Sequence, residues 1–405
     1  MSAVVADGRW KALALICAGV IGAMACWFST TAIGPDLVSH WGLSNTQSAW
    51  LTNAVQIGFV LGALASSAVN LPDIMPMTRL ITIAATLAAL ANGAVLLEPD
   101  FAGLLLARLA TGVALAGVYP PALKLMATWF VKGRGLAMGL LVGALTLGSA
   151  MPHLLRALGQ GLDWRLVVAG ASIAALTSAC IFGLTVREGP HGFARASFDP
   201  RQTLAVLRDR PVRLANLGYF GHMWELYAMW AWFLSFAIAA GQAGDLPFGN
   251  ASVLTFVVIA SGVIGCALGG FLSDLVGRCL TTAGMMAVSG SCAVLICLAW
   301  AGPAWVVALI AIIWGISIIG DSAQFSAALT ELSDPRLVGT ALTMQLALGF
   351  ALTVVAIWLM PVLATLLGGW RWVFLALMPG PFMGAWAMMR LRGLPQAARM
   401  AAGRR

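Results

Sequence analysis

The chain has 405 residues, of which 60% are hydrophobic and only 9% are charged, and its formal net charge is +8 at pH 7. Soluble globular domains carry about 25% charged residues, so this composition excludes an ordinary soluble enzyme or binding domain. It favours a protein whose solvent is largely the lipid bilayer.

Apolar stretches long enough to cross a bilayer follow one another along almost the whole chain. A spanning helix needs about 20 predominantly apolar residues. The sequence predicts twelve such helices, near 12–33, 47–70, 78–97, 101–125, 135–158, 164–186, 212–240, 250–274, 280–301, 304–330, 337–366 and 370–391. The predicted fold class is an all-α membrane protein, and the first stretch is too long for a cleaved signal peptide.

One long basic connection, which contains Gly and Pro, divides the predicted helices into two sets of six. We therefore expect an N-terminal six-helix bundle at 1–187, a cytoplasmic linker at 188–211 and a C-terminal six-helix bundle at 212–405. Two short matches indicate a parallel repeat: 23–28 resembles 228–233, and 134–137 loosely resembles 336–339. Each match occupies the same place in its half and runs in the same direction.

The basic residues are distributed as in a membrane topology. Of the 23 Lys and Arg residues, 18 lie in or beside segments on one side of the membrane, and three (Arg156, Arg165 and Arg371) lie at helix ends on the other side. Arg108 and Lys124 are assigned to neither side. This is the positive-inside pattern. It predicts cytoplasmic N- and C-termini, and it argues against a nucleic-acid partner.

Polar residues inside the apolar stretches are the candidates for function, because a charge near the middle of a spanning helix costs at least about 2.5 kcal/mol. In the second stretch, Asn53 and Gln56 are either neutral ligand contacts or interhelical hydrogen-bonding groups. In the fourth stretch, Arg108 and Tyr119 share one helical face with Gly112. Arg108 has two possible functional roles: it binds an anionic group, or it orients a carboxylate that carries protons. Alternatively, lipid headgroups or backbone carbonyls accept its hydrogen bonds and it has a structural role.

The seventh stretch is the richest in such residues. A single helical stripe carries His222, Glu225, Met229 and Trp232, with Tyr219 beside it. A buried glutamate suits a group that takes up and releases a proton in each cycle, and His222 one turn away can relay that proton. The alternative is a fixed structural pair between Glu225 and Arg108.

The tenth stretch places Asp321 and Gln324 on one face with Trp314 and Ser317. The repeat offset aligns Asp321 with Tyr119, so both halves have a polar group at a matching depth. Asp321 is a second candidate proton carrier, and its alternative role is a structural acid bonded to neighbouring helices.

Sulfur-containing side chains suggest a second kind of cargo. Thioethers are soft ligands that suit Cu(I). The ligands of an alternative copper site would be His222, Met223, Met229, Met24 and Cys26. Methionine on apolar helices more often fills the core. The sequence has no Walker loop, no dinucleotide-binding glycine pattern and no nucleophile elbow, so we expect neither an enzyme nor a cofactor.

The loop at 270–278 resembles the Gly-x-Leu-x-Asp-x-x-Gly-Arg motif of the major facilitator superfamily. Its Asp274 and Arg278 can pair or cap neighbouring helix ends. The first-half copy is degraded, since Ser66 stands where the motif has Asp. Arg108 to Gly112 resembles the Arg-x-x-x-Gly motif of the same superfamily.

The resemblance covers essentially the whole chain, and it implies two six-helix bundles that rock about a midplane cavity without ATP. The loop motif implies the conformational-gate residues Asp274 and Arg278, while the buried ionisable residues Glu225, Asp321 and His222 are the expected proton-coupling residues. The implied substrate-binding residues are Arg108, Trp27, Asn53, Gln56, Tyr119, Lys124, Tyr219, Met229, Trp232 and Gln324.

We therefore expect a monomeric permease of the bacterial inner membrane that moves a small organic solute, anionic or flat and aromatic, together with protons. Three alternatives remain open at this point. The first alternative is export of toxic compounds, and the second is import of copper. The third is a membrane sensor or assembly factor that transports nothing.

Overall fold

The computed structural model describes residues 3–130, 133–159, 163–191, 208–334 and 337–405, and within them the chain forms helices and turns without strands. The chain divides into two compact units. Unit 1 comprises residues 1–43 and 50–195, and unit 2 comprises residues 44–49 and 196–405. Most of the expected linker, residues 192–207, lies outside the described residues.

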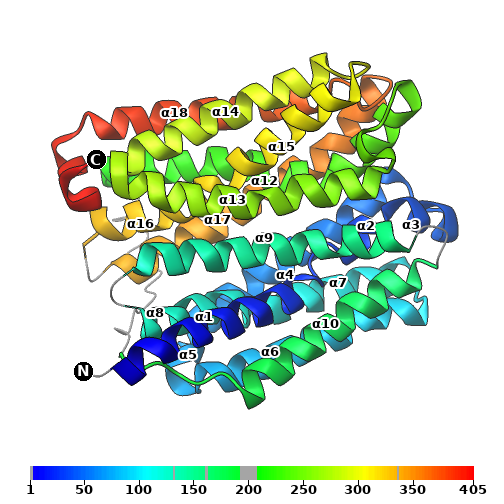
Figure 1. The fold of residues 1–405 in the computed structure, drawn as a ribbon. Coiled ribbons are helices and arrows are strands. Elements are labelled where there is room, and N and C mark those ends of the chain that lie inside the picture. Colours follow the sequence, from blue (N-terminus) through cyan, green and yellow to red (C-terminus); the bar gives the residue numbers. More distant parts are fainter. Residues whose placement is uncertain (1–2, 131–132, 160–162, 192–207, 335–336) are drawn as a thin grey trace. The chain divides into compact units, whose positions relative to one another are not determined.

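Unit 1 contains the helices from α1 to α10, which run side by side for most of their length (Figure 1). Their bounds are α1 Ala3–Met24, α2 Ser29–Ala32, α3 Gly34–Trp41, α4 Asn45–Ala68, α5 Leu71–Ile74, α6 Met77–Gly93, η1 Ala94–Leu97, α7 Phe101–Ala116, α8 Tyr119–Trp129, α9 Arg134–Leu158 and α10 Arg165–Leu184. The first residues of α4 cluster with unit 2.

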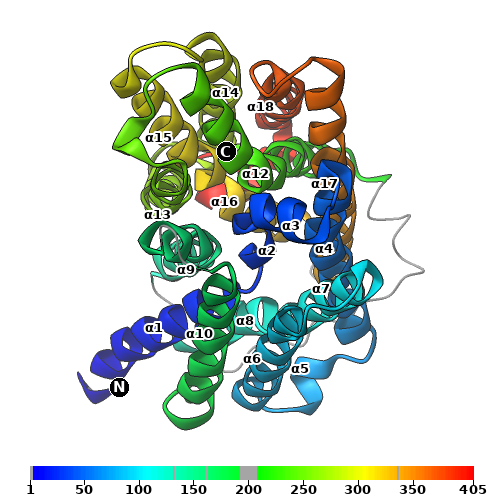
Figure 2. The same cartoon turned by 90° about the vertical axis from the view of Figure 1, so that its right-hand side faces the viewer.

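Unit 2 contains the helices from α12 onward, which Figure 2 views nearly end-on, with α12 among α13, α15, α17 and α18. Their bounds are α12 Arg210–Ala243, η3 Pro247–Gly249, α13 Ala251–Val276, α14 Arg278–Leu298, α15 Ala304–Gly320, α16 Ser322–Leu332, α17 Val338–Leu366, η4 Val373–Leu377, α18 Pro379–Arg392 and η5 Pro395–Gly403.

Ten helical segments of the described residues are long and apolar enough to span a membrane. They match the second to the eleventh predicted spans, which confirms the all-α membrane fold class. The other two predicted spans are helical but interrupted. Residues 12–33 comprise the end of α1, a turn and α2, and residues 370–391 comprise turns, η4 and α18.

Two further spans are broken near their middle. α7 gives way to α8 at Gly117 and Val118, and α15 gives way to α16 at Asp321. The break in the first span, at Ala25–Phe28, has no counterpart in α12, which stays continuous through the matching residues 228–233. The local sequence match therefore does not extend to backbone conformation.

The two units pack their helices in the same pattern. α6 packs on α10 as α14 packs on α18, and α1 packs on α9 and α10 as α12 packs on α17 and α18. Glycines repeat the pattern at the α4–α7 and α13–α15 contacts. A Cβ on Gly58 would lie 2.1 Å from the carbonyl oxygen of Leu109, and one on Gly265 would lie 1.9 Å from that of Ile316. Gly265 follows Gly58 by 207 positions, and Ile316 follows Leu109 by the same 207 positions. An equal offset for both residues of a contact is what a parallel repeat requires.

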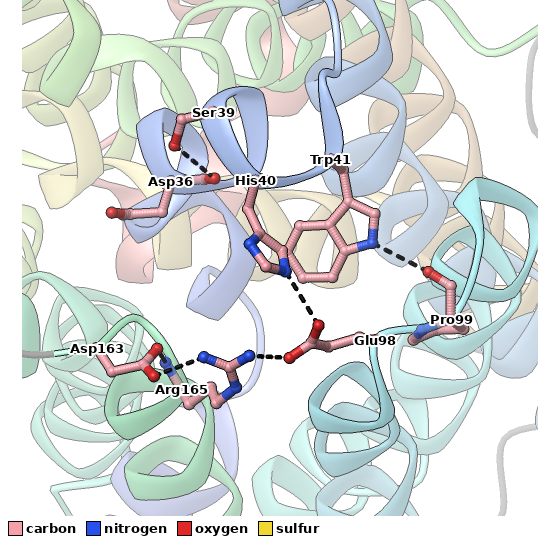
Figure 3. Close-up of polar contacts among 8 residues, drawn as sticks. All are labelled: Asp36, Ser39, His40, Trp41, Glu98, Pro99, Asp163 and Arg165. Atoms are coloured by element: carbon pink, nitrogen blue, oxygen red, sulfur yellow. Dashed lines mark hydrogen bonds and ion pairs between the residues drawn. The ribbon is translucent and has the colours of Figure 1, made fainter.

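A polar network joins the end of α3, the turn between η1 and α7, and the start of α10 in unit 1 (Figure 3). Nε2 of His40 lies 3.0 Å from the Glu98 carboxylate, whose other oxygen pairs with Arg165. Arg165 also pairs with Asp163 at 2.5 Å, and Nε1 of Trp41 donates to the carbonyl of Pro99 at 3.0 Å. The bonds from His40 and Arg165 hold the pKa of the Glu98 carboxyl below its usual value.

Candidate functional site

Glu225 lies inside unit 2, and its donors among the described residues are neutral groups. Its side chain is buried, Nε1 of Trp314 donates to Oε1 at 2.7 Å, and Oγ of Ser289 donates to Oε2 at 2.8 Å. Among the described residues, no Lys, Arg or His forms a salt bridge with this carboxyl. A buried carboxyl without a cationic partner avoids the cost of a buried charge by binding a proton.

His222 and Asp321 form a second buried acid–base pair. Nδ1 of His222 lies 2.9 Å from Oδ1 of Asp321, although the two groups are not aligned as a hydrogen bond, and each side chain is at most 2% exposed. Nε2 of His222 has no hydrogen-bond partner within the described part of the chain. The pair therefore has a free ring nitrogen with which to pass a proton or to meet a solute.

The helical repeat brings these groups together. His222 and Glu225 are one turn apart on α12, and both project toward the α15–α16 span that carries Trp314 and Asp321. Asp321 occupies the break between those two helices. The sequence predicted these three proton-coupling candidates, and the structure places all of them in one unit.

Arg108 is fully buried inside unit 1, and its guanidinium is bonded to neutral oxygens. Nη2 donates to the carbonyls of Cys26 at 3.0 Å and Trp27 at 2.6 Å, while Nη1 donates to Oγ of Ser29 at 3.1 Å and Oδ1 of Asn92 at 2.7 Å. The two carbonyls belong to the break between α1 and α2. Arg108 thus supplies donors that the interrupted helix lacks.

The alternative of a structural Glu225–Arg108 pair gains no support from these contacts. Both Glu225 oxygens accept bonds within unit 2, and both terminal nitrogens of Arg108 donate within unit 1. Contact between Arg108 and a substrate stays a prediction. The guanidinium has no exposed surface through which to make that contact in this structure.

α4 lies on the other side of the helix break and carries buried polar residues there, among them Thr52 and Gln56. Thr31 and Thr52 share a 2.8 Å hydrogen bond, and the rings of Trp27 and Phe59 are 4.8 Å apart. Gln56 lies on the α4 face between Thr52 and Phe59. Its amide is fully buried, and neither its oxygen nor its nitrogen has a hydrogen-bond partner among the described residues.

The other residues predicted to bind substrate have mixed surroundings. Tyr219 packs against His222 and Phe325, with ring centroids 6.1 and 6.0 Å away. Nε1 of Trp232 donates to the carbonyl of Ile357 at 2.9 Å, and its ring stacks on Trp370. Four further predicted residues lie in the helices where the sequence placed them. Asn53 on α4 and Met229 on α12 are buried, and Tyr119 and Lys124 on α8 are half-buried.

Arg278 forms the centre of a polar cluster at the α13–α14 turn. Its Nε and Nη2 bind the two oxygens of Glu331 at 2.7 and 2.5 Å, and its Nη1 donates to Gln324 at 2.8 Å. The predicted gate residue Arg278 therefore pairs with Glu331 rather than with Asp274, whose side chain is exposed. Gln324, predicted as a substrate contact, is bonded to this cluster.

Sequence reasoning missed the neutral partners of the buried charges. Asn92 bonds to Arg108, Ser29 and Ser172, and Ser289 bonds to Glu225. Glu331 was not singled out either. Asn92 and Ser289 lie in helices that otherwise read as apolar packing, and an isolated Ser or Asn there gives no signal of which charge it will meet.

A family model for the Major Facilitator Superfamily matches residues 15–344, which is most of the chain. The chain belongs to the major facilitator superfamily. The bacterial homologue of the human lysosomal transporter Spinster, solved in an inward-facing and unoccupied conformation, superposes with a TM-score of 0.69 over 98% of this chain and all of that one, at 16% identity. That similarity shows the fold alone.

A fungal relative is "MFS-type transporter pytF" of Aspergillus terreus, which is 29% identical over 174 residues. The match spans 41% of this chain and 55% of that relative. Members of the superfamily are secondary transporters, and the family match together with the long apolar helices indicates a multi-pass membrane protein. The family and the fold are those of transporters and not of enzymes.

Proposed function

We propose that this chain is a proton-coupled permease of the bacterial inner membrane that moves a small organic solute by alternating access. The observation that carries the proposal is the set of buried acids in unit 2. Glu225 is bonded only to neutral donors, and Asp321 is paired only with His222, whose other nitrogen is unoccupied among the described residues. Buried acids of this kind mark proton pathways in transporters.

In the proposed cycle, Glu225 and the His222–Asp321 pair each bind a proton on one side of the membrane and release it on the other. Neutralised carboxyls tolerate the apolar interior, whereas ionised ones favour access to water. Trp314 and Ser289 hold the Glu225 carboxyl in place through the cycle. The proton therefore biases which conformation the protein occupies.

The solute contact best supported by the structure is Gln56. A buried amide without a partner is costly, so it normally binds water or a ligand. Because Arg108 is engaged by the helix break, we propose a solute recognised through neutral hydrogen bonds and aromatic packing rather than through a salt bridge. This favours a flat aromatic solute over a simple anion.

Copper import is the weaker alternative. The Cys26 thiol lies 3.5 Å from the carbonyl oxygen of Ala171, and the His222 ring faces Asp321. The described residues include no group of three or more His, Cys, Asp or Glu side chains placed to hold a metal ion. Neither the contact of Cys26 with Ala171 nor that of His222 with Asp321 favours binding of a soft metal ion. The proposed site is compatible with export of the solute as well as with import.

A thermal-shift screen tests the proposal without assuming a direction of transport. The purified protein is melted with a panel of aromatic metabolites, organic anions, vitamins and Cu(I), at pH 5.5 and 7.5. A ligand that binds only the folded state raises Tm by mass action. We expect a hit among flat organic solutes whose affinity depends on pH and is lost in Gln56→Ala. A hit confined to Cu(I) would contradict the proposal.

A further inference from the structure

The last described segment of the chain folds back onto unit 2. After α18, the short helix η5 lies beside α16 (Figure 1). Ala397 and Met400 are fully buried although their neighbours Ala398 and Arg399 are exposed. The segment 395–405, named here the tail, therefore has one apolar face that is covered.

Two polar contacts tie the tail to the cluster around Arg278. The backbone N–H of Ala401 donates to Oε2 of Glu331 at 3.1 Å, the same oxygen that accepts from Nε of Arg278 at 2.7 Å. The side chain of Arg404 donates to the carbonyl of Asp274. The tail thus shares an acceptor with the predicted gate residue Arg278 and bonds the backbone of the other gate residue, Asp274.

The turn between α13 and α14 leaves room for the tail. A Cβ on Gly277 would lie 2.4 Å from the carbonyl oxygen of Arg404 and 2.5 Å from that of Arg405. The tail itself adopts an unfavourable backbone, with φ of 47° at Ala401 and 54° at Ala402. Left-handed conformations of non-glycine residues cost of order 1–3 kcal/mol and persist only where surrounding contacts fix them.

α16 is the element that these contacts restrain. It is a separate helix of 11 residues, it begins directly after Asp321, and it carries both Gln324 and Glu331. Arg278 bonds to both of those side chains, and the tail bonds to Glu331. Without the tail, the side-chain hydrogen bonds from Arg278 and the packing of α16 on α13 and α14 would still hold α16 near the α13–α14 turn, but the hydrogen bond from Ala401 to Glu331 would be lost.

We propose that residues 395–405 are a regulatory strap that holds α16 against the α13–α14 turn. When the strap is docked, α16 is restrained at its junction with Asp321, and transport is slowed. When it is released, α16 moves more freely about that junction. The docking and the restraint stand on the contacts above, whereas the effect on rate rests on the proposed function.

Hydrogen exchange followed by mass spectrometry tests the strap without any substrate. The full-length chain is compared with Arg404→Ala and Met400→Asp, which remove a polar and an apolar docking contact. Arg399→Ala is the matched control, because Arg399 is an exposed arginine of the same segment. We expect exchange at Ser322–Leu332 to become about tenfold faster in the two variants, as expected for easier local opening, and to stay unchanged in the control.

The proposal fails if exchange in α16 is unchanged while the amides of the tail become exposed. It also fails if the Ala401 amide already exchanges freely in the unaltered protein, since the tail would then not be docked. Solute uptake gives a separate answer. A faster rate in Arg404→Ala and Met400→Asp supports regulation. An unchanged rate with a loosened α16 rejects regulation and leaves the proposed function untouched.

Discussion

At the scale of single residues, the two units stabilise their buried ionisable side chains with different hydrogen-bond partners. Arg108 in unit 1 donates to two main-chain carbonyls, a hydroxyl and an amide oxygen. Glu225 in unit 2 accepts from an indole and a hydroxyl. The first arrangement needs the planar fork of arginine, while the second tolerates a proton on the carboxyl.

Arg108→Lys is expected to lower stability strongly although it keeps the positive charge. An ammonium has no fork with which to reach Trp27, Cys26 and Asn92 together, so buried acceptors lose their donors. Each buried acceptor that loses its donor costs about 1–3 kcal/mol. The readout is the melting temperature in detergent, with the half-buried Arg156→Lys as control. Equal melting of both variants would contradict the assigned role.

The Glu98 network is expected to weaken in acid. Because bonds from His40 and Arg165 lower the pKa of Glu98, its contribution is present above the ordinary glutamate pKa and is lost as pH falls through the lowered value. Hydrogen exchange of residues 94–103, measured between pH 3 and 7 and corrected for intrinsic rates, is expected to become faster at the acidic end. Glu98→Gln should be loose at every pH. A loop that responds to acid equally in both proteins would refute this assignment.

The sequence identified the buried charges but not their partners. Glu225, His222 and Asp321 stood out because ionisable residues are rare inside apolar stretches. Their neighbours Ser289 and Trp314 are ordinary members of apolar helices. The assignment of each charge to a partner depends on helix rotation and depth, which a single sequence does not encode locally.

At the scale of helices, close backbone contact sets the packing of each unit. The α13–α15 contact is the tightest example, because a Cβ on Gly269 would lie 1.7 Å from the carbonyl oxygen of Gly320. Small residues that let helices approach are the usual means of association in lipid. The contact also places Asp321, the next residue after Gly320, opposite α12.

Gly269→Ala is expected to separate α13 from α15 and to destabilise the protein by about 1–3 kcal/mol, the usual cost of overpacking. Gly284→Ala on α14 is the matched control, since its added Cβ meets no atom within 4 Å. That change should be neutral or should stabilise by up to about 1 kcal/mol through helix propensity. Thermal melting of both variants measures the difference, and an unaffected Gly269→Ala protein would contradict the contact.

Helix positions were predictable from hydropathy, whereas the break in the first span was not. The second to eleventh spans match the apolar stretches closely. The break at Ala25–Phe28 occurs in an uninterrupted apolar run without proline, and it exists beside a guanidinium from another helix. A tertiary partner, rather than a local signal, stabilises that conformation.

At the scale of the whole molecule, two units of repeated design differ in the charge that they bury. Unit 1 buries an arginine at a helix break, and unit 2 buries two carboxyls and a histidine around α12 and Asp321. The sequence was sufficient to indicate the superfamily and the repeat. The solute itself was not predictable, because the candidate contacts are isolated polar and aromatic side chains in apolar helices, a pattern that many solutes share.

The most direct test of proton coupling is solute-dependent proton movement in proteoliposomes that contain a pH-sensitive dye. The unaltered protein, Glu225→Gln and the control Asp245→Asn, an exposed carboxyl in a loop, are reconstituted and given the solute found by thermal shift. Proton entry is expected with the unaltered protein and the control, while Glu225→Gln should bind and exchange solute without moving protons. Normal proton movement by Glu225→Gln would contradict the account.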